Sequence, residues 1–192
     1  MQPAYFLAFD GLADWEAGLA LAEVNRAERF HVVTVGLSAG PITTMGGVQI
    51  TPQITLGELN QDDAAILIIP GGDRWEEVTE PVLIELLRQL DTLRVPIAAI
   101  CGATLALARA GLLDRRRHTS NQPGYIDTHV PEYGGRQLYI DEPCVSDAGV
   151  ITASGVASVT FARDILAQLR VFDDENLAAW YHLFKHGILP EQ

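Results

Sequence analysis

The stretch VPIAAICGATLALARAG, residues 95–111, decides how this chain folds. An apolar run of strand length ends on Cys101, one glycine follows, and a segment rich in alanine and leucine begins at once. This order is typical of a sharp turn from a strand into a helix, the arrangement called a nucleophile elbow in hydrolases. The turn presents the Cys101 side chain at the carboxyl end of the strand, so we predict a reactive cysteine there.

Two properties of the predicted turn favour chemistry at Cys101. The first N–H groups of the following helix would point at the sulfur and lower the pKa of the thiol. Gly102 lets the backbone turn tightly and lets another group approach the sulfur. The alternative is a packing role, because free cysteines are among the most buried residue types and this one follows an apolar strand. The Cys-Gly pair at the boundary favours a nucleophile or a redox sensor over packing.

Length, composition and charge narrow the function classes. The 192 residues fit one domain with a sizeable core, and we predict a single domain over 1–192. A content of 48% hydrophobic and 20% charged residues is typical of a soluble globular protein. The formal charge of -12 argues against a nucleic-acid partner. The one basic cluster, 115–117, is interpreted as a solvated turn, or as a neighbour of an anionic substrate.

The cysteine count and the start of the chain bear on cofactors and location. Cys101 and Cys144 are the two cysteines, and they lack CxxC spacing, so we predict no metal, no disulfide framework and no cofactor. The chain starts without a basic segment or a small-residue cleavage site, and no apolar run approaches membrane-spanning length. We therefore expect a cytoplasmic protein without a membrane partner.

Strand and helix patterns alternate along the chain. This order predicts an α/β fold with a mainly parallel sheet and crossover helices. Glycine and proline residues between 37 and 58 predict a small hairpin or excursion at the sheet edge. Strands are expected at 4–9, 30–35, 64–69, 95–100, 118–121 and 150–155, with edge strands near 138–140 and 144–145. Helices are expected at 14–26, 81–93, 103–114, 125–129, 157–169 and 175–186, the last packed on the body of the protein.

Residues far apart in sequence are expected to meet at Cys101. The loops that follow parallel strands converge on one edge of the sheet, and ligands of open α/β sheets bind at that edge. Asp14 is also a candidate N-cap for the helix at 14–26. The loops supply the candidates Asp14, Glu16, Gly72, Asp73, Gly102, His118 and Asn121.

Among these candidates, three kinds of group could assist the cysteine. A buried Glu16 would have a raised pKa and could donate a hydrogen bond to a thiolate or carry a proton; the alternative is an acid that complements the helix dipole. The N–H groups of Gly72 and Gly102 could form an oxyanion hole, or serve only the turns. His118 is a candidate general base, or a core histidine with a satisfied nitrogen.

Several strings together make the sequence resemble the ThiJ/PfpI superfamily over nearly the whole chain. This group is similar to the glutamine amidotransferases and includes parkinsonism-associated deglycase-like proteins, intracellular protease-like proteins and isocyanide hydratases. The strings are DWE at 14–16, IPGG at 69–72, AICGAT at 99–104, AGLL at 110–113, HTSN at 118–121 and VITA at 150–153.

The resemblance implies a flavodoxin-like three-layer α/β sandwich, commonly homodimeric, with an easily oxidised cysteine on the elbow. It implies that Cys101 is the nucleophile and that Glu16 is its protonated hydrogen-bond partner. It also implies that the amides of Gly72 and Gly102 form the anion hole.

Departures from the family pattern bear on the activity. Gly102 stands where protease-like members carry histidine, which argues against a peptidase, and Asn121 stands where deglycase-like members carry histidine. A pocket arginine of those members aligns near Gly46, and no His-x-Glu pair of the amidotransferases follows Ser154.

Two main functions follow from this resemblance and its departures. We expect an enzyme that acts on a small electrophilic or amide substrate, as a hydrolase, a glyoxalase or deglycase, or an amidotransferase-like protein. The alternative is a non-enzymatic redox sensor or stress-response chaperone that uses oxidation of the same cysteine. A third possibility is a scaffold with an unreactive Cys101.

Overall fold

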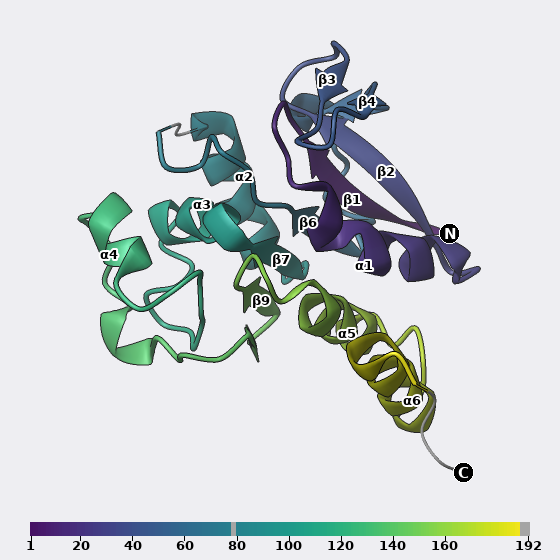
Figure 1. Ribbon diagram of the computed structural model, residues 1–192. Helices are drawn as coiled ribbons and strands as arrows, with labels where there is room; N and C mark the ends of the chain where they lie inside the picture. Colours follow the sequence, from purple (N-terminus) through teal and green to yellow (C-terminus); the bar gives the residue numbers. More distant parts are fainter. Residues whose placement is uncertain (78–79, 189–192) are drawn as a thin grey trace.

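A sheet of seven strands runs through the molecule, in the order β5-β2-β1-β6-β7-β9-β8 (Figure 1). The structure, a computed structural model, describes residues 1–77 and 80–188. Neighbouring strands are parallel except for the antiparallel pair β8 and β9, which confirms the predicted mainly parallel sheet. The strands are β1 (Gln2–Ala8), β2 (Phe30–Gly36), β5 (Ile54–Thr55), β6 (Ile66–Ile69), β7 (Ile97–Ile100), β8 (Cys144–Asp147) and β9 (Val150–Ala153).

Helices cover both faces of this sheet, so the flavodoxin-like three-layer fold is confirmed (Figure 1). Helices α1 (Asp14–Arg26) and α5 (Ser158–Gln168) pack against each other, as do α2 (Pro81–Thr92) and α3 (Thr104–Arg109). Strands β6, β7 and β9 are buried at every position. Strands covered on both faces read as continuous apolar runs rather than alternating ones, which is why the sequence revealed them.

The hairpin at the sheet edge and the C-terminal helix form where the sequence predicts them. Strands β3 (Ile42–Thr43) and β4 (Gln49–Ile50) form the predicted hairpin, and β5 with the short 3-10 helix η1 (Leu56–Glu58) returns the chain to the sheet edge. Helix α6 (Asp174–His186) packs on α5, as expected. The Asp173 side chain caps α6 by accepting a hydrogen bond from the Asn176 N–H at 2.8 Å.

Three expected elements differ from the structure. The strand at 118–121 is absent: only an isolated bridge joins His118 to Tyr139, because the Thr152 hydroxyl takes the Thr119 N–H at 2.9 Å in place of a strand partner. The helix after the elbow ends at Arg109, and Gly111 turns the chain with φ +76°. Near 138–140 the chain forms the 3-10 helix η3 (Arg136–Leu138) rather than an edge strand, whereas the edge strand near 144–145 is β8.

The remaining elements position the residues of the candidate site around Cys101. The 3-10 turn η2 (Cys101–Ala103) joins β7 to α3, and the short helix α4 (Tyr125–His129) forms where the sequence predicts it. The carboxyl ends of β1, β6, β7 and β9 lie at one edge of the parallel sheet. Within the described ranges 1–77 and 80–188, none of the helices has the length and apolar character needed to cross a membrane.

Candidate active site

Cys101 sits on a strained turn at the end of β7. Ile100 is extended, and Cys101 adopts φ +60°, a left-handed conformation that is unusual for a residue with a side chain. The Thr104 hydroxyl donates to the Cys101 carbonyl at 2.8 Å and contacts the Ser120 hydroxyl at 2.6 Å. A strained residue of this kind costs about 1–3 kcal/mol and persists because its surroundings hold it. The predicted elbow is confirmed.

Gly102 is required by the packing of the elbow. A Cβ atom added to Gly102 would lie 2.9 Å from the Cβ of Trp75, closer than such atoms approach. Trp75 itself is buried, and its indole N–H donates to the Pro70 carbonyl at 3.0 Å. The Trp75 side chain thus holds the loop after β6 against the start of the elbow helix.

Glu16, from the first turn of α1, is a buried carboxyl group beside the cysteine. Its side chain is 0% exposed, and Oε2 accepts a hydrogen bond from the Gly71 N–H. Oε1 lies next to the Cys101 sulfur, and within the described residues it is buried without a hydrogen-bonding N–H or O–H group. Burial raises the pKa of Glu16 to about 7, against the opposing effect of the Gly71 N–H. Glu16 can therefore hold a proton near neutral pH.

The environment of the Cys101 thiol differs from the sequence prediction. Burial and the negative charge of Glu16 raise its pKa, although the Asn121 amide and the Gly102 N–H favour the thiolate. The predicted lowering by the helix is wrong, because desolvation of the sulfur outweighs the donors at this turn. When Glu16 is protonated, its charge no longer opposes the thiolate and its O–H can donate to sulfur. The two groups therefore titrate as a pair.

Asn121 and two unpredicted glycines complete the contacts of the sulfur. The Asn121 amide donates to Sγ at 3.4 Å, and its oxygen accepts from the Gly155 N–H at 3.1 Å. A Cβ on Gly155 would lie 2.9 Å from Sγ and 3.1 Å from Oε1 of Glu16. A Cβ on Gly71 would lie 2.5 Å from the Cys101 Cβ. Both glycines follow strands at the predicted edge, and that position is the signal that could have found them.

Gly72 and Asp73, in the loop after β6, differ from Gly71 in their surroundings. A Cβ on Gly72 would meet the Gly11 carbonyl oxygen at 2.5 Å, so Gly71 is the glycine packed against Cys101 and Glu16. The role of the Gly72 N–H in an anion hole stays a prediction. Asp73 follows in the same loop and is exposed.

Asp14 holds the hairpin rather than capping α1. Ala13 is the N-cap of that helix. The Asp14 carboxylate accepts from the Thr44 hydroxyl at 2.6 Å and the Gly46 N–H at 2.7 Å. The Thr44 hydroxyl lowers the pKa of Asp14 by stabilising its charged form. The predicted cap is wrong because the β3–β4 hairpin supplies stronger donors to the same side chain.

His118 is a core histidine, which corrects its candidacy as a base. One ring nitrogen contacts the Arg116 carbonyl at 2.7 Å, and the other contacts the Tyr133 hydroxyl. The side chain is buried, and this desolvation lowers its pKa. With both nitrogens occupied, a neutral His118 has no free position for proton transfer to Cys101.

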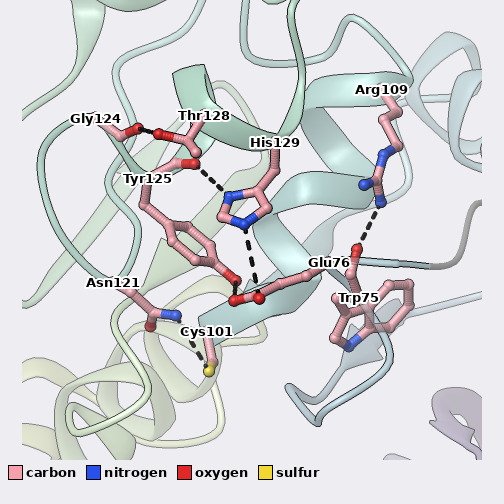
Figure 2. A network of polar contacts seen from close by, with 9 residues as sticks. All are labelled: Trp75, Glu76, Cys101, Arg109, Asn121, Gly124, Tyr125, Thr128 and His129. Atoms are coloured by element: carbon pink, nitrogen blue, oxygen red, sulfur yellow. Dashed lines mark hydrogen bonds and ion pairs between the residues drawn. The ribbon is translucent and has the colours of Figure 1, made fainter.

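A second polar network lies over the sulfur and was not predicted. Figure 2 shows the Tyr125 hydroxyl and the Glu76 carboxylate above Cys101, with Asn121 beside them. The Tyr125 hydroxyl donates to Glu76 at 3.1 Å, and His129 Nε2 lies 3.6 Å from the other Glu76 oxygen. His129 Nδ1 contacts the Tyr125 carbonyl at 2.9 Å. Glu76 and His129 carry no sequence motif, and the loop before α4 brings them together.

The described residues contain no group of three or more His, Cys, Asp or Glu side chains arranged to hold a metal ion. The chemistry available from these side chains is that of a sulfur nucleophile, carboxyl groups that carry protons and N–H donors that stabilise negative charge.

Comparison with known proteins identifies relatives of this chain. The profile of the DJ-1/PfpI family matches residues 2–168. A Bacillus subtilis protein named as the uncharacterized protease YoaZ is 41% identical over 189 residues, covering 94% of this chain and 90% of that protein. The deglycase PfpI of Pyrococcus furiosus is 31% identical over 129 residues, covering 67% and 75%. The crystal structure of a thiJ/pfpI family protein from Bacillus anthracis superimposes with a TM-score of 0.90 at 40% identity, covering 98% of this chain and 93% of that one.

Proposed function

Since the chain belongs to the DJ-1/PfpI family, we propose that it is an enzyme in which Cys101 attacks a small electrophilic carbonyl or amide carbon. The observation that carries this proposal is the buried Glu16 carboxyl beside a cysteine held at φ +60°. The interaction of Glu16 with the Cys101 thiol and its pKa of about 7 suit a group that exchanges a proton with the thiol.

The first step moves a proton and an electron pair between identified groups. The Cys101 thiol gives its proton to the Glu16 carboxylate, and the thiolate forms a bond to the substrate carbon. The C=O electron pair moves to oxygen, where backbone N–H groups at the elbow stabilise the charge. Glu16 then returns its proton to the oxygen or to the leaving group. The step needs no cofactor.

The family offers more than one substrate class for this chemistry. The Pyrococcus relative carries the name deglycase and the Bacillus relative the name protease. Gly102 follows Cys101 directly, where the resemblance places histidine in protease-like members. We therefore propose small aldehydes and amides rather than folded proteins as substrates.

The experiment is a turnover screen of the wild type, Cys101→Ser and Cys144→Ser with methylglyoxal and a set of small amides. We expect turnover by the wild type and Cys144→Ser, and background rates for Cys101→Ser. Turnover that survives in Cys101→Ser would overturn the proposal. So would the absence of turnover with every substrate, together with selective oxidation of Cys101 by peroxide, which is the outcome expected of a redox sensor.

The homodimer and the cytoplasmic location stay predictions from the resemblance and the sequence. Sedimentation equilibrium tests the dimer directly, with twice the chain mass as the expected result.

A further inference from the structure

We infer that Tyr125, Glu76 and His129 form a proton relay over Cys101, in which Tyr125 takes a proton from the water that hydrolyses an acyl group bound to the sulfur. The inference rests on the proposed function and deepens it, because it names the reaction as acyl transfer to water. Tyr125 is the group that touches the reacting water. Glu76 receives the proton that Tyr125 gives up, and His129 is a positioning residue.

The position of Tyr125 is the first argument for this relay. The Asn121 amide interacts with both the Cys101 sulfur and the Tyr125 hydroxyl. The hydroxyl and the reacting sulfur are therefore neighbours of the same asparagine side chain. Figure 2 shows the hydroxyl directed to the side of the site where Cys101 lies. The Tyr125 side chain is otherwise buried, which fixes the hydroxyl in place.

The direction of the hydrogen bonds is the second argument. The Tyr125 O–H donates to Glu76, so the lone pairs of the phenol oxygen are left for donors on the Cys101 side. Burial and the negative charge of Glu76 raise the pKa of Tyr125, which keeps the hydroxyl protonated. A neutral phenol in this position accepts one proton only as it passes its own to the carboxylate.

His129 fixes the carboxylate that ends the relay. Its Nδ1 faces the Tyr125 carbonyl, which only accepts, so Nδ1 carries a proton and Nε2 faces Glu76. The Tyr125 hydroxyl holds one oxygen of Glu76, and His129 holds the other, 3.6 Å from Nε2, when the imidazole is protonated at both nitrogens. The Glu76 side chain is 53% exposed, so a proton that arrives there can pass to solvent.

The third argument is the absence of another base at the sulfur among residues 1–77 and 80–188. Asn121 cannot accept a proton, and both nitrogens of His118 are occupied in the core. Glu16 is fully buried and its Oε2 is bound by the Gly71 N–H, so it is closed to a water that arrives from solvent, whereas the Glu76 side chain is 53% exposed. The proton of an attacking water therefore needs a separate acceptor, which the Tyr125–Glu76 pair provides.

The step balances as follows. Water forms a bond to the acyl carbon, and the C–S bond breaks with its electron pair on sulfur. One water proton moves to the Tyr125 oxygen while the Tyr125 proton moves to Glu76. The acid product leaves, Cys101 recovers a proton from solvent, and Glu76 releases its proton to solvent.

The test uses p-nitrophenyl acetate, whose nitrophenolate release and acetyl transfer are both observable. Stopped-flow absorbance measures acylation of Cys101, and intact-mass spectrometry follows loss of the acetyl group. For Tyr125→Phe we expect acylation within about twofold of the wild type, and deacylation slower by about 100-fold, the usual contribution of a general base. Glu76→Gln keeps the shape of the carboxylate without its basicity, and we expect a similar delay.

Tyr133→Phe is the matched control. Tyr133 is buried like Tyr125, but its hydroxyl contacts His118 in the core and takes no part in the relay. We expect wild-type deacylation for this variant. His129→Gln tests positioning, with a smaller delay of about tenfold and unchanged acylation.

The outcomes separate this inference from the proposed function. Wild-type deacylation rates in both Tyr125→Phe and Glu76→Gln would overturn the relay and leave Cys101 as the nucleophile. Failure of the wild type to form an acetyl adduct on Cys101 would overturn both. If Tyr125→Phe does not fold, Glu76→Gln decides, because Glu76 is exposed and its loss leaves the core intact.

Discussion

Cys101 and Cys144 are both partly buried and each thiol interacts with a carboxyl group, yet the two carboxyl groups differ in the groups that hold them. Cys144, in the edge strand β8, donates its S–H to Asp164 at 3.3 Å. Asp164 also accepts from the Ser146 hydroxyl and from Arg163, each at 2.7 Å, so it is held as a charged acceptor. Burial and this negative charge raise the pKa of Cys144 far above its ordinary range.

At Cys101 the thiol interacts with Glu16, and the sulfur also accepts hydrogen bonds. The Asn121 amide and the Gly102 N–H are donors, and among residues 1–77 and 80–188 no cationic side chain pairs with Glu16 to keep it charged. A protonated Glu16 adds a third donor. The comparison teaches that the charge of the neighbouring carboxyl group adds to the effect of burial on the reactivity of each thiol.

The effect that follows most directly from this difference is in alkylation. At pH 8, iodoacetamide should modify Cys101 faster than Cys144, by about tenfold or more, because burial and Asp164 raise the pKa of Cys144 much further and the thiolate is the form that reacts. Peptide mass spectrometry after timed quenching measures both rates in one sample. Equal rates at the two cysteines would break the comparison.

Glu16→Gln should separate activity from stability. The variant cannot take the thiol proton, so turnover should fall by about 100-fold or more. The pKa of Glu16 is raised in the folded protein, to about 7 from an ordinary value of 4.5. The folded state therefore loses stability as the pH rises from about 4.5 through 7, whereas a neutral glutamine does not. At pH 8 the variant should be more stable than the wild type by up to about 3 kcal/mol.

Urea unfolding at pH 5 and pH 8 checks this prediction, with turnover measured in parallel. The free energy of unfolding of Glu16→Gln minus that of the wild type should grow between the two pH values. A difference that stays constant with pH would mean that Glu16 is charged in the folded protein at pH 5. The proton-carrying role at Cys101 would then be wrong.

Local sequence patterns predicted the elbow and Glu16. Which of two similar residues lies in the site, by contrast, depends on contacts with residues distant in the sequence. An apolar strand followed by Cys101-Gly102 indicates the turn from the local sequence alone. In the structure, Gly102 is also the residue that leaves room for Trp75. The order of strands places Glu16 at the same sheet edge. Gly71 and Gly72 are indistinguishable in sequence, because only the path of the loop decides which one faces Cys101.

The two histidines beyond the elbow illustrate the same limit. His118 precedes Asn121 closely and looked like the better partner, whereas His129 has no motif. In the structure the Thr152 hydroxyl binds the Thr119 N–H and removes the expected strand, so the chain places His118 in the core. The loop that follows then brings α4 over the sulfur. A contact between residues 33 positions apart thus helps to place His118 in the core, whereas His129 joins the network of Tyr125 and Glu76.

A smaller effect is expected from Asp164→Asn. The substitution removes the charge that helps to hold the Cys144 proton and leaves Arg163 nearby, so the pKa of Cys144 should fall. Alkylation of Cys144 should rise by about tenfold, equivalent to one pKa unit. Alkylation of Cys101 in the same sample should not change, which provides an internal control. An unchanged Cys144 rate would show that burial alone protects that thiol.

The smallest effect is expected at Asn121, which supplies one of the donors to the Cys101 sulfur. A hydrogen bond to a charged group contributes about 1.5–3 kcal/mol when buried and less when exposed, and Asn121 is exposed. In Asn121→Ala the thiolate loses this donor, so alkylation of Cys101 at pH 7 should slow by about fivefold. Asn121→Asp keeps the acceptor for the Gly155 N–H but replaces the donor with a negative charge. Its alkylation should therefore be slower than that of Asn121→Ala, and the reverse order would show that Asn121 acts by holding Gly155 rather than by stabilising the thiolate.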